Sequence, residues 1–313
     1  MRTFPTPMLT RRAALTSAAA LPLAAATLGG RPAMAAAEMA ATPNAPFNRL
    51  MLGEMEVTSL LAGTRTVPDP HKIFGLNASG EEFAEAADDA LIPTDKAQFF
   101  FTPTLVNTGA ELILFDTGVA AEGIVAAIEA AGYSADQVDR VVITHMHGDH
   151  IGGLMAGDAP TFANAAYTTG SAEYDHWAAA GNEGFDTKVR PLAEKMDMIE
   201  DGASVASGIT GMATPGHTPG HMSYMLESGG QSLLLLGDVA NHFVWSVGYP
   251  DWEVSFDNDK AMAAKTRRAT LDMLAADKVP FIGYHMPFPA LGYVKPRDSG
   301  FEYVPASYQF KLT

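Results

Sequence analysis

The segment THMHGDHIGG, residues 144–153, places three histidines and one aspartate within six positions. Imidazole and carboxylate are the ligands that zinc and other borderline divalent metals prefer in proteins. The preceding residues 139–144 predict a buried strand, so His145 and His147 should lie on one side of the extended chain and Met146 on the other. Asp149 and His150 follow at a turn, where they can face a second ion. Because the chain has only nine histidines in 313 residues, three of them within six positions are not expected by chance.

Four further stretches carry polar side chains after apolar runs or in a tight turn. The Gly/Pro-rich turn TPGHTPGH, residues 214–221, can hold His217 rigidly, and LLLLGD ends in Asp238, which can bridge two ions. The run KVPFIGYH ends in His285, and LILFDTG carries Asp116. Polar residues that follow several predicted strands indicate one site along one edge of a sheet sandwich.

Together, the HxHxDH segment, the GHTPGH turn, the strand-end GD and the late histidine resemble the metallo-β-lactamase-fold hydrolase superfamily. The resemblance covers residues 47–313. Residues 49–63 and 99–118 resemble, more narrowly, the methyl parathion hydrolase and lactonase branch. The superfamily implies an α/β fold, the αβ/βα four-layer sandwich. It also implies one metal on His145, His147 and His217, a second on Asp149, His150 and His285, and Asp238 between them.

Two other groups of the superfamily fit this chain less well. The broad-spectrum type of zinc β-lactamase uses a Cys ligand and usually has Arg where this chain has His150, and the chain contains no Cys. Glyoxalase II, a thiolester hydrolase, shares the ligand pattern and stays open as an alternative. The sequence has no evident basic cluster for its glutathione substrate.

Two polar residues near the expected ligands are predicted to support them. Asp116 should orient a ligand or the metal loop rather than bind an ion itself. His221 should steady its own loop through a hydrogen bond.

The amino terminus predicts export. Residues 1–12 carry positive charge without any acid, residues 13–28 form an Ala/Leu-rich run shorter than a membrane span, and Ala33-Met34-Ala35 offers a cleavage site. We therefore expect a signal peptide at 1–35, a linker at 36–46, the hydrolase domain at 47–313, and a periplasmic product. Arg11-Arg12 favours twin-arginine export, while ordinary secretion stays open. Without Cys the product has no disulfides, and no later stretch predicts a membrane span.

The composition and net charge limit the classes of partner that we expect. The formal net charge is −16, and removal of residues 1–35, which hold four Arg and no acid, brings it to about −20. Such a chain is not expected to bind nucleic acid, because phosphate backbones need a cationic surface. We expect a small neutral substrate, although the acidity also serves solubility. An apolar content of 47% and a mature length of about 275 residues suit one large domain of two similar halves.

Local patterns predict a series of strand pairs with interspersed helices. Strands are expected at 50–61, 99–105, 111–115, 139–144, 166–169, 222–227 and 231–236, with a late strand before His285 and a closing hairpin around 297–300. Helices are expected at 121–131, from a Ser171 cap to 180, at 193–198 and at 259–276.

The expected chemistry follows from two divalent ions, with zinc as the default and manganese, cobalt or iron as alternatives. Ions roughly 3.5–4 Å apart can share a water and turn it into a bridging hydroxide near neutral pH. That hydroxide would cleave lactones or other neutral carboxylic esters, with Asp149 or Asp238 as candidate proton carriers. No G-x-S-x-G motif and no Cys supports covalent catalysis. A phosphotriester, as in methyl parathion hydrolase, is the alternative substrate.

The aromatic residues near the expected ligands predict an apolar pocket mouth; the alternative is that some of them belong to the core or to a dimer contact. A metal-binding protein without turnover would lack a ligand, whereas this chain has all seven. An exposed aromatic edge would favour a homodimer. The expected pocket residues are Phe99, Trp177, His242, Phe243, Trp245 and Phe288.

Overall fold

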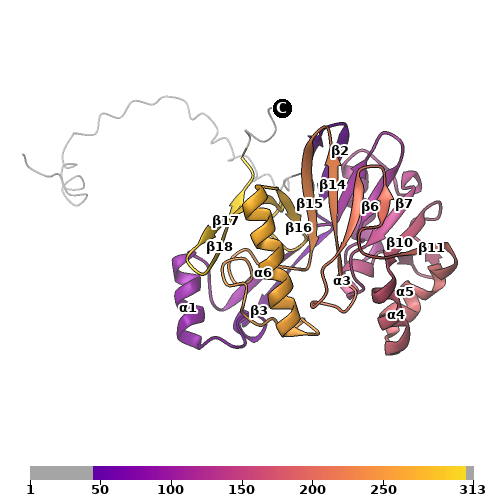
Figure 1. Ribbon diagram of the computed structural model, residues 1–313. Helices are drawn as coiled ribbons and strands as arrows, with labels where there is room; N and C mark the ends of the chain where they lie inside the picture. Colours follow the sequence, from indigo (N-terminus) through magenta and orange to yellow (C-terminus); the bar gives the residue numbers. More distant parts are fainter. Residues whose placement is uncertain (1–44, 308–313) are drawn as a thin grey trace, which may run out of the picture. The chain divides into compact units, whose positions relative to one another are not determined.

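The computed structural model describes residues 45–307, and the fold is reported for that part of the chain. Two seven-stranded sheets make up most of it (Figure 1). The first sheet has the order β1 (Phe47–Leu52), β2 (Met55–Leu60), β5 (Thr104–Asn107), β6 (Leu112–Phe115), β7 (Arg140–Ile143), β10 (Ala166–Gly170) and β11 (Met196–Ile199). The second has the order β12 (Ser204–Ala206), β13 (Ile209–Ala213), β14 (Met222–Ser228), β15 (Gln231–Gly237), β16 (Phe281–Gly283), β17 (Leu291–Arg297) and β18 (Gly300–Pro305).

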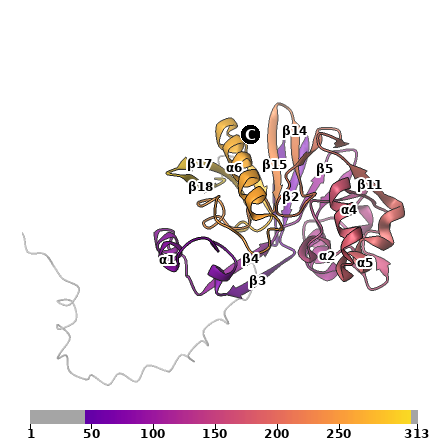
Figure 2. The ribbon, with the colours of Figure 1, turned by 60° about the horizontal axis from the view of Figure 1, so that its bottom comes forward.

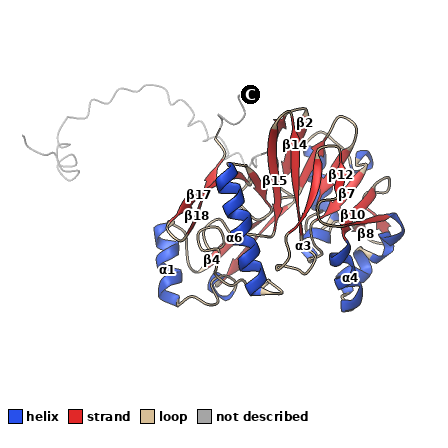
Figure 3. Ribbon diagram, viewed as in Figure 1, coloured by secondary structure: helices blue, strands red, loops and turns tan. Residues whose placement is uncertain are grey.

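Two short ribbons and several helices complete the described part (Figure 3). The ribbons are β3 (Gly63–Pro68) with β4 (Lys96–Phe101), and β8 (Met155–Ala156) with β9 (Ala159–Pro160). The α-helices are α1 (Gly80–Asp89), α2 (Ala121–Ala130), α3 (Gly148–Ile151), α4 (Ser171–Ala180), α5 (Glu183–Lys188) and α6 (Lys260–Asp277). Short 3₁₀ turns lie at η1 (Pro70–Lys72), η2 (Ala135–Gln137) and η3 (Arg190–Lys195).

Successive side chains of a strand face opposite sides of its sheet, so they pack in different layers of the core. In β6, Leu112 and Leu114 pack in the cluster that contains Ile124 of α2, whereas Ile113 and Phe115 pack with the second sheet. Leucines of α6 join the cluster of the second sheet. Figure 1 shows α6 on one side of the strands and α4 and α5 on the other. The predicted αβ/βα four-layer sandwich is confirmed.

Parallel pairing brings the polar strand ends together. Strands β6, β7 and β10 run parallel in the first sheet, and β15 and β16 run parallel in the second. Carboxyl ends of parallel strands meet at one edge of a sheet. The segments that follow β6, β7, β15 and β16 carry Asp116, His145, Asp238 and His285.

A third apolar cluster lies beside this edge. It joins Phe99 and Phe101 of β4, Phe83 of α1, and Trp245 and Val254 of the segment before α6. The β3–β4 ribbon belongs to neither large sheet, so it can form a separate wall next to the metal-binding edge (Figure 2).

Two predicted strands are each broken in two. The run 50–61 turns back at Gly53, whose φ of 56° reverses the chain between β1 and β2. The run 99–105 breaks at Thr102 and Pro103, so that β4 pairs with β3 and β5 pairs with β2. Proline has no N–H for a strand ladder, which explains the second break.

Two helix predictions are also corrected. Residues 193–198 were expected to form a helix, but they divide between η3 and β11, and β11 is recruited as a parallel edge strand by β10. Gly170, rather than Ser171, is the N-cap of α4, and no side chain caps that helix. The predicted helices at 121–131 and 259–276 are confirmed to within a residue, and Asp259 Oδ1 accepts from Met262 N at 2.9 Å.

The predicted signal peptide and almost all of the predicted linker lie outside the described residues. Among residues 45–307, no helix combines the length and the apolar character that crossing a membrane requires.

Candidate metal centre

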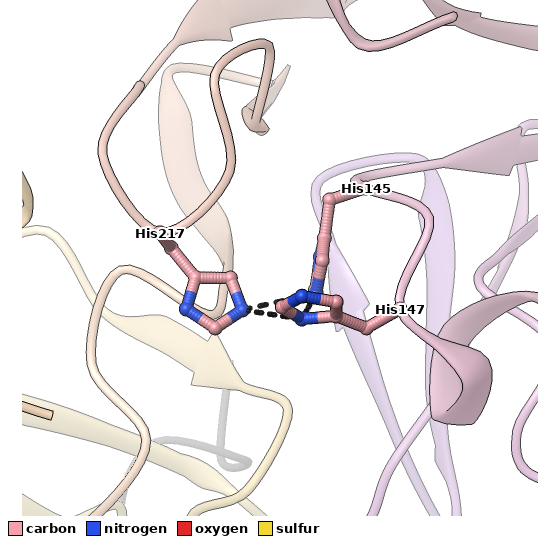
Figure 4. Close-up of side chains that lie close together, drawn as sticks. All are labelled: His145, His147 and His217. Atoms are coloured by element: carbon pink, nitrogen blue, oxygen red, sulfur yellow. Dashed lines mark hydrogen bonds between the residues drawn. The ribbon is translucent and has the colours of Figure 1, made fainter. Parts of the chain in front are cut away.

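Three histidines converge on one point (Figure 4). His145 and His147 lie in the loop after β7, and His217 lies in the loop between β13 and β14. His217 Nε2 is 3.2 Å from His145 Nε2 and 2.9 Å from His147 Nδ1, and the last two atoms are 3.1 Å apart. His145 and His217 are buried and His147 is half-buried, and together they form one group of possible metal ligands.

A second group adjoins the first. Asp149, His150 and His285 bring ligand atoms together, and the two carboxylate oxygens of Asp238 reach toward both groups. Asp238 Oδ2 is 3.4 Å from His217 Nε2 and 3.2 Å from His285 Nε2, while its Oδ1 is 3.4 Å from His150 Nε2. Asp238 therefore lies between the two sets, as expected for a shared ligand.

Hydrogen bonds on the outer side of the rings determine which nitrogen faces the centre. His150 Nδ1 donates to Asp116 Oδ2 at 2.8 Å, and His285 Nδ1 donates to the Phe100 carbonyl at 2.9 Å. Thr144 Oγ1 donates to Asp116 Oδ2, so it accepts from His145 Nδ1 at 3.1 Å. His217 Nδ1 donates to Asp257 Oδ1 at 2.9 Å. Because Nδ1 is engaged on the outer side, each of these four rings turns its Nε2 toward the centre.

The nitrogen and oxygen atoms that face the centre are arranged to bind a cation rather than to hydrogen-bond with one another. Neutral histidines with lone pairs about 3 Å apart repel unless a proton or a metal lies between them. His150 Nε2 and Asp238 Oδ1 are buried and have no hydrogen-bond partner. Such orphaned buried atoms are costly unless they bind an ion.

Charge balance supports the same conclusion. The carboxylates of Asp116, Asp149, Asp238, Asp257 and Glu173 line or back the centre, and Arg267 is the fully buried cation among the described residues. With the histidines deprotonated, as metal binding requires, five carboxylates against one guanidinium leave an excess of four negative charges. Two divalent cations would neutralise that excess.

The protonation tendencies of the two groups differ. Burial lowers the pKa of His147 to about 4 and holds the pKa of His145 well below its usual range. Burial also lowers the pKa of His285, but the carboxylates of Asp238 and Asp149 outweigh it and raise that pKa to about 10. Burial raises the pKa of Asp149, yet the nearby His150 and His285 hold it at about 2. The second group thus attracts positive charge most strongly.

Two glycines of the GHTPGH turn explain how its loop reaches the centre. A Cβ on Gly216, whose φ is 130°, would lie 2.3 Å from the Ala263 nitrogen of α6. A Cβ on Gly220 would lie 2.0 Å from the Glu173 nitrogen of α4. The loop is therefore pressed between α4 and α6, and only glycine permits both approaches.

The two predicted supporting residues contact the ligands from outside. Asp116 holds Thr144 and His150, as described above. His221 is buried; its Nδ1 lies 2.8 Å from Thr214 Oγ1, and its Nε2 accepts from the Asp238 backbone N–H at 2.9 Å. Because both ring nitrogens are occupied, His221 steadies the Asp238 loop and is not placed to bind an ion.

Sequence reasoning missed a buried carboxylate behind the histidines. Glu173 of α4 is fully buried, and its Oε1 accepts from Met146 N at 2.9 Å and from Trp177 Nε1 at 2.6 Å. Its Oε2 accepts from Thr218 Oγ1 at 2.7 Å and from Gly220 N at 3.0 Å. Glu173 thus ties together the loops of His145–His147 and His217. Its position in an ordinary helical pattern offered no signal of this role.

A cavity of about 770 Å³ opens over the two groups. Five of the seven predicted ligands line its floor, and Arg65 is the charged residue of its upper wall. The remaining wall is largely apolar and includes Val67, Ile73, Phe99, Phe101, Val119 and Phe256.

The other predicted pocket residues lie elsewhere. His242, Phe243 and Trp245 line a neighbouring cavity of about 340 Å³, which shares His285 with the first and lies against Phe100. Alternate residues of β4 thus face different cavities, Phe99 and Phe101 one and Phe100 the other. Trp177 and Phe288 line neither of these two cavities. The Trp177 ring lies edge-on to His147 with its N–H on Glu173, so it serves as packing behind a ligand.

Comparison with known proteins agrees with this geometry. A family model described as the metallo-beta-lactamase superfamily matches residues 102–280, more than half of the chain. The chain belongs to that superfamily, and the resemblance inferred from its motifs is confirmed.

Several relatives and solved structures are similar to the chain. An N-acyl homoserine lactonase of Bacillus cereus is 31% identical over 113 residues, 36% of this chain and 42% of that protein. The lactamase-like protein nscB of Neosartorya fischeri is 30% identical over 135 residues, 43% of this chain and 36% of that protein. The chain thus spans less than half the length of these curated relatives.

Two solved structures resemble the chain over more of its length. AidC, described as a dizinc quorum-quenching lactonase in complex with a product, has 26% identity and a TM-score of 0.77 over 83% of this chain and 97% of its own. The hydrolase AbOPH has 24% identity and a TM-score of 0.80 over 85% of this chain and 99% of its own, and it supports the fold alone.

Proposed function

We propose that this protein is a binuclear, metal-dependent hydrolase that cleaves lactones or other neutral carboxylic esters. One observation carries the proposal. Two adjoining sets of ligands share Asp238 at the floor of a largely apolar cavity. The lactonase descriptions of AidC and of the Bacillus cereus relative support it.

The residues that would hold the ions are those of the two groups. His145, His147 and His217 would bind one and Asp149, His150 and His285 the other, with Asp238 between them. Two divalent ions, zinc by preference of the ligands, would supply a hydroxide near neutral pH and polarise the ester carbonyl. The protein's own side chains then have to orient the substrate and move protons.

Exposure distinguishes the two candidate proton carriers. The Asp149 side chain is 28% exposed, whereas that of Asp238 is 4% exposed and has histidine nitrogens near both oxygens. Asp149 can therefore pass a proton to a leaving alkoxide in the cavity and exchange it with solvent. We assign the proton transfer to Asp149, in addition to its place in the second ligand set, and to Asp238 the ligand role alone.

The cavity wall selects the substrate class. Phe99, Phe101 and Phe256 offer apolar and aromatic surface to an acyl or aryl group, and a volume of about 770 Å³ lies within the range of small-molecule sites. Among the described lining residues, Arg65 is the lone Lys or Arg, so the wall lacks the cation cluster that a glutathione thiolester would need.

A neutral aryl phosphotriester is the second candidate substrate. The three phenylalanines of the wall can pack against an aryl leaving group as well as against an acyl chain. The same ligand sets serve attack on phosphorus and on a carbonyl carbon.

The decisive experiment compares kcat/KM of the zinc-loaded protein on an aryl lactone and on a neutral aryl phosphotriester. We expect a clear preference for the lactone and loss of activity after chelation. A reversed preference would assign the protein to phosphotriester cleavage. Full activity of metal-free protein would refute the metal-dependent mechanism.

We further propose that the protein acts in the periplasm after removal of residues 1–35. Residues 1–12 and Arg11-Arg12 support export, preferably by the twin-arginine route. Cell fractionation of wild type and of Arg11→Lys/Arg12→Lys tests the location.

A further inference from the structure

We propose that Arg267 and Asp257 form a positioning pair, which determines how tightly the three-histidine group binds its metal ion. The inference rests on the proposed metal-binding function, but it concerns residues that lie behind the ligands. Asp257 and Arg267 do not themselves line the cavity over the ligands, so they act through His217 and the Asp238 loop.

Arg267 occupies an unusual position for a cation. It lies in the middle of α6, and its side chain is fully buried. Its Nε donates to the Val239 carbonyl at 2.8 Å, and its Nη1 donates to the carbonyls of Pro250 and Trp252 at 3.0 and 3.1 Å. Its Nη2 donates to Asp257 Oδ2 at 2.7 Å. A buried guanidinium needs such partners, because burial of an unpaired charge is costly.

Asp257 connects this cation to a predicted ligand. Its Oδ2 accepts from Arg267, and its Oδ1 accepts from His217 Nδ1 at 2.9 Å. That bond keeps the proton on Nδ1 and points the Nε2 lone pair toward His145 and His147. The carboxylate side chain is itself wholly buried, so rotation of Asp257 is blocked by its two partners.

The same guanidinium also holds the shared ligand. Val239, whose carbonyl accepts from Arg267 Nε, directly follows Asp238. On the other side, the Asp238 backbone N–H donates to His221 Nε2. Arg267 therefore reaches His217 through Asp257 and Asp238 through the backbone, and one buried charge aligns two ligands of the same ion.

A purely structural ion pair would look different. The pair formed by Arg268, the next residue of α6, and Asp251 has side chains 35% and 67% exposed. Arg268 donates to Asp251 and to the Ser299 carbonyl, and neither residue is a predicted ligand. It ties α6 to the same preceding segment without contact with the centre. Arg268 thus provides a matched control for the packing of α6.

The test measures metal affinity rather than hydrolysis. In the full chain we would compare Asp257→Asn, Arg267→Met and Arg267→Lys with the control Arg268→Met, using chelator competition for zinc and the visible spectrum of bound cobalt. Asp257→Asn and Arg267→Met should lower the affinity for one of the two ions by roughly 10–100-fold, the range found when a partner of a metal-bound histidine is removed. Arg267→Lys should recover part of the lost affinity, and Arg268→Met should leave the affinity for both ions unchanged.

Two results would overturn the inference. One is unchanged affinity in Asp257→Asn and Arg267→Met, and the other is an equal loss of both ions. If these variants fail to fold, ¹⁵N NMR of the histidine rings in the zinc-loaded wild type decides instead. A His217 proton on Nδ1, with a shift that reports a strong hydrogen bond, supports the pair, and a proton on Nε2 refutes it. Because no substrate is involved, failure of the lactonase proposal would leave this result intact.

Discussion

The two groups of predicted metal ligands adjoin Asp238 but are held in place by different parts of the molecule. The three-histidine group is supported by Glu173 of α4, and by Asp257, which precedes α6 and is itself held by Arg267 of that helix. The group of Asp149, His150 and His285 is supported by Asp116 and by a backbone carbonyl of the β3–β4 ribbon.

This difference has a physical consequence. Side-chain carboxylates behind the first group are charged and rigidly hydrogen-bonded, whereas the carbonyl behind His285 is neutral and belongs to a ribbon outside the large sheets. We therefore expect the first group to depend on single distant side chains, and the His285 side of the second group to depend on the position of the ribbon. The following predictions test that contrast.

The largest effect should come from the ligand that the groups share. Asp238→Ala removes an oxygen near His150 and another near His217 and His285, so both ions should be lost. Since a metal ion supplies several kcal/mol of transition-state stabilisation, kcat/KM should fall about a thousandfold or more. Metal analysis after gel filtration checks the stoichiometry, and retention of one tightly bound ion would show that Asp238 is not shared.

His147→Ala should disrupt only the three-histidine group. His147 contacts the other two histidines of its group and belongs to no ligand set around His285. We expect loss of one ion, retention of the other, and a fall in hydrolysis of roughly a hundredfold or more. Titration with cobalt counts the remaining ion. Loss of both ions would show that the groups are not independent.

Glu173→Gln should weaken the hydrogen bonds that hold the loops of the three-histidine group together. The amide nitrogen of Gln would face two donors that now point at a carboxylate oxygen, which leaves buried donors unsatisfied. We expect a loss of about 3 kcal/mol in the free energy of unfolding of the metal-free protein. Urea unfolding measures it, with Glu183→Gln on the exposed first turn of α5 as the control. Equal curves for the two variants would contradict the bracing role of Glu173.

The smallest effect concerns the two faces of β4. Phe99→Leu removes aromatic surface from the cavity over the ligands, whereas Phe100→Leu changes the neighbouring cavity and leaves its carbonyl bond to His285. Phe99→Leu should raise KM for aryl and long-chain substrates about three- to tenfold, because about 1 kcal/mol of apolar contact is lost. Phe100→Leu should leave KM near the wild-type value. A larger effect of Phe100→Leu would assign substrate binding to the other face.

The comparison also shows which features a pattern of residues can predict. The ligand candidates stand directly after apolar strands or in a Gly/Pro turn, and these are local signals. The breaks at Gly53 and Pro103 were missed, because the runs 50–61 and 99–105 carry apolar residues on both sides of the break. Strand β11 was missed because its parallel partner β10 is a distant segment, and such pairing overrides local helical preference.

The sequence by itself determined the layered fold and the residues that converge, because strand periodicity and parallel pairing carry the polar ends of β6, β7, β15 and β16 to one edge. The tertiary structure alone decided what lies behind and above them. Glu173, Asp257 and Arg267 act through contacts between residues 10 to 47 positions apart, and the cavity wall arises where the β3–β4 ribbon meets the ligand loops. Such contacts depend on how the layers pack in three dimensions, and no local pattern of side chains encodes them.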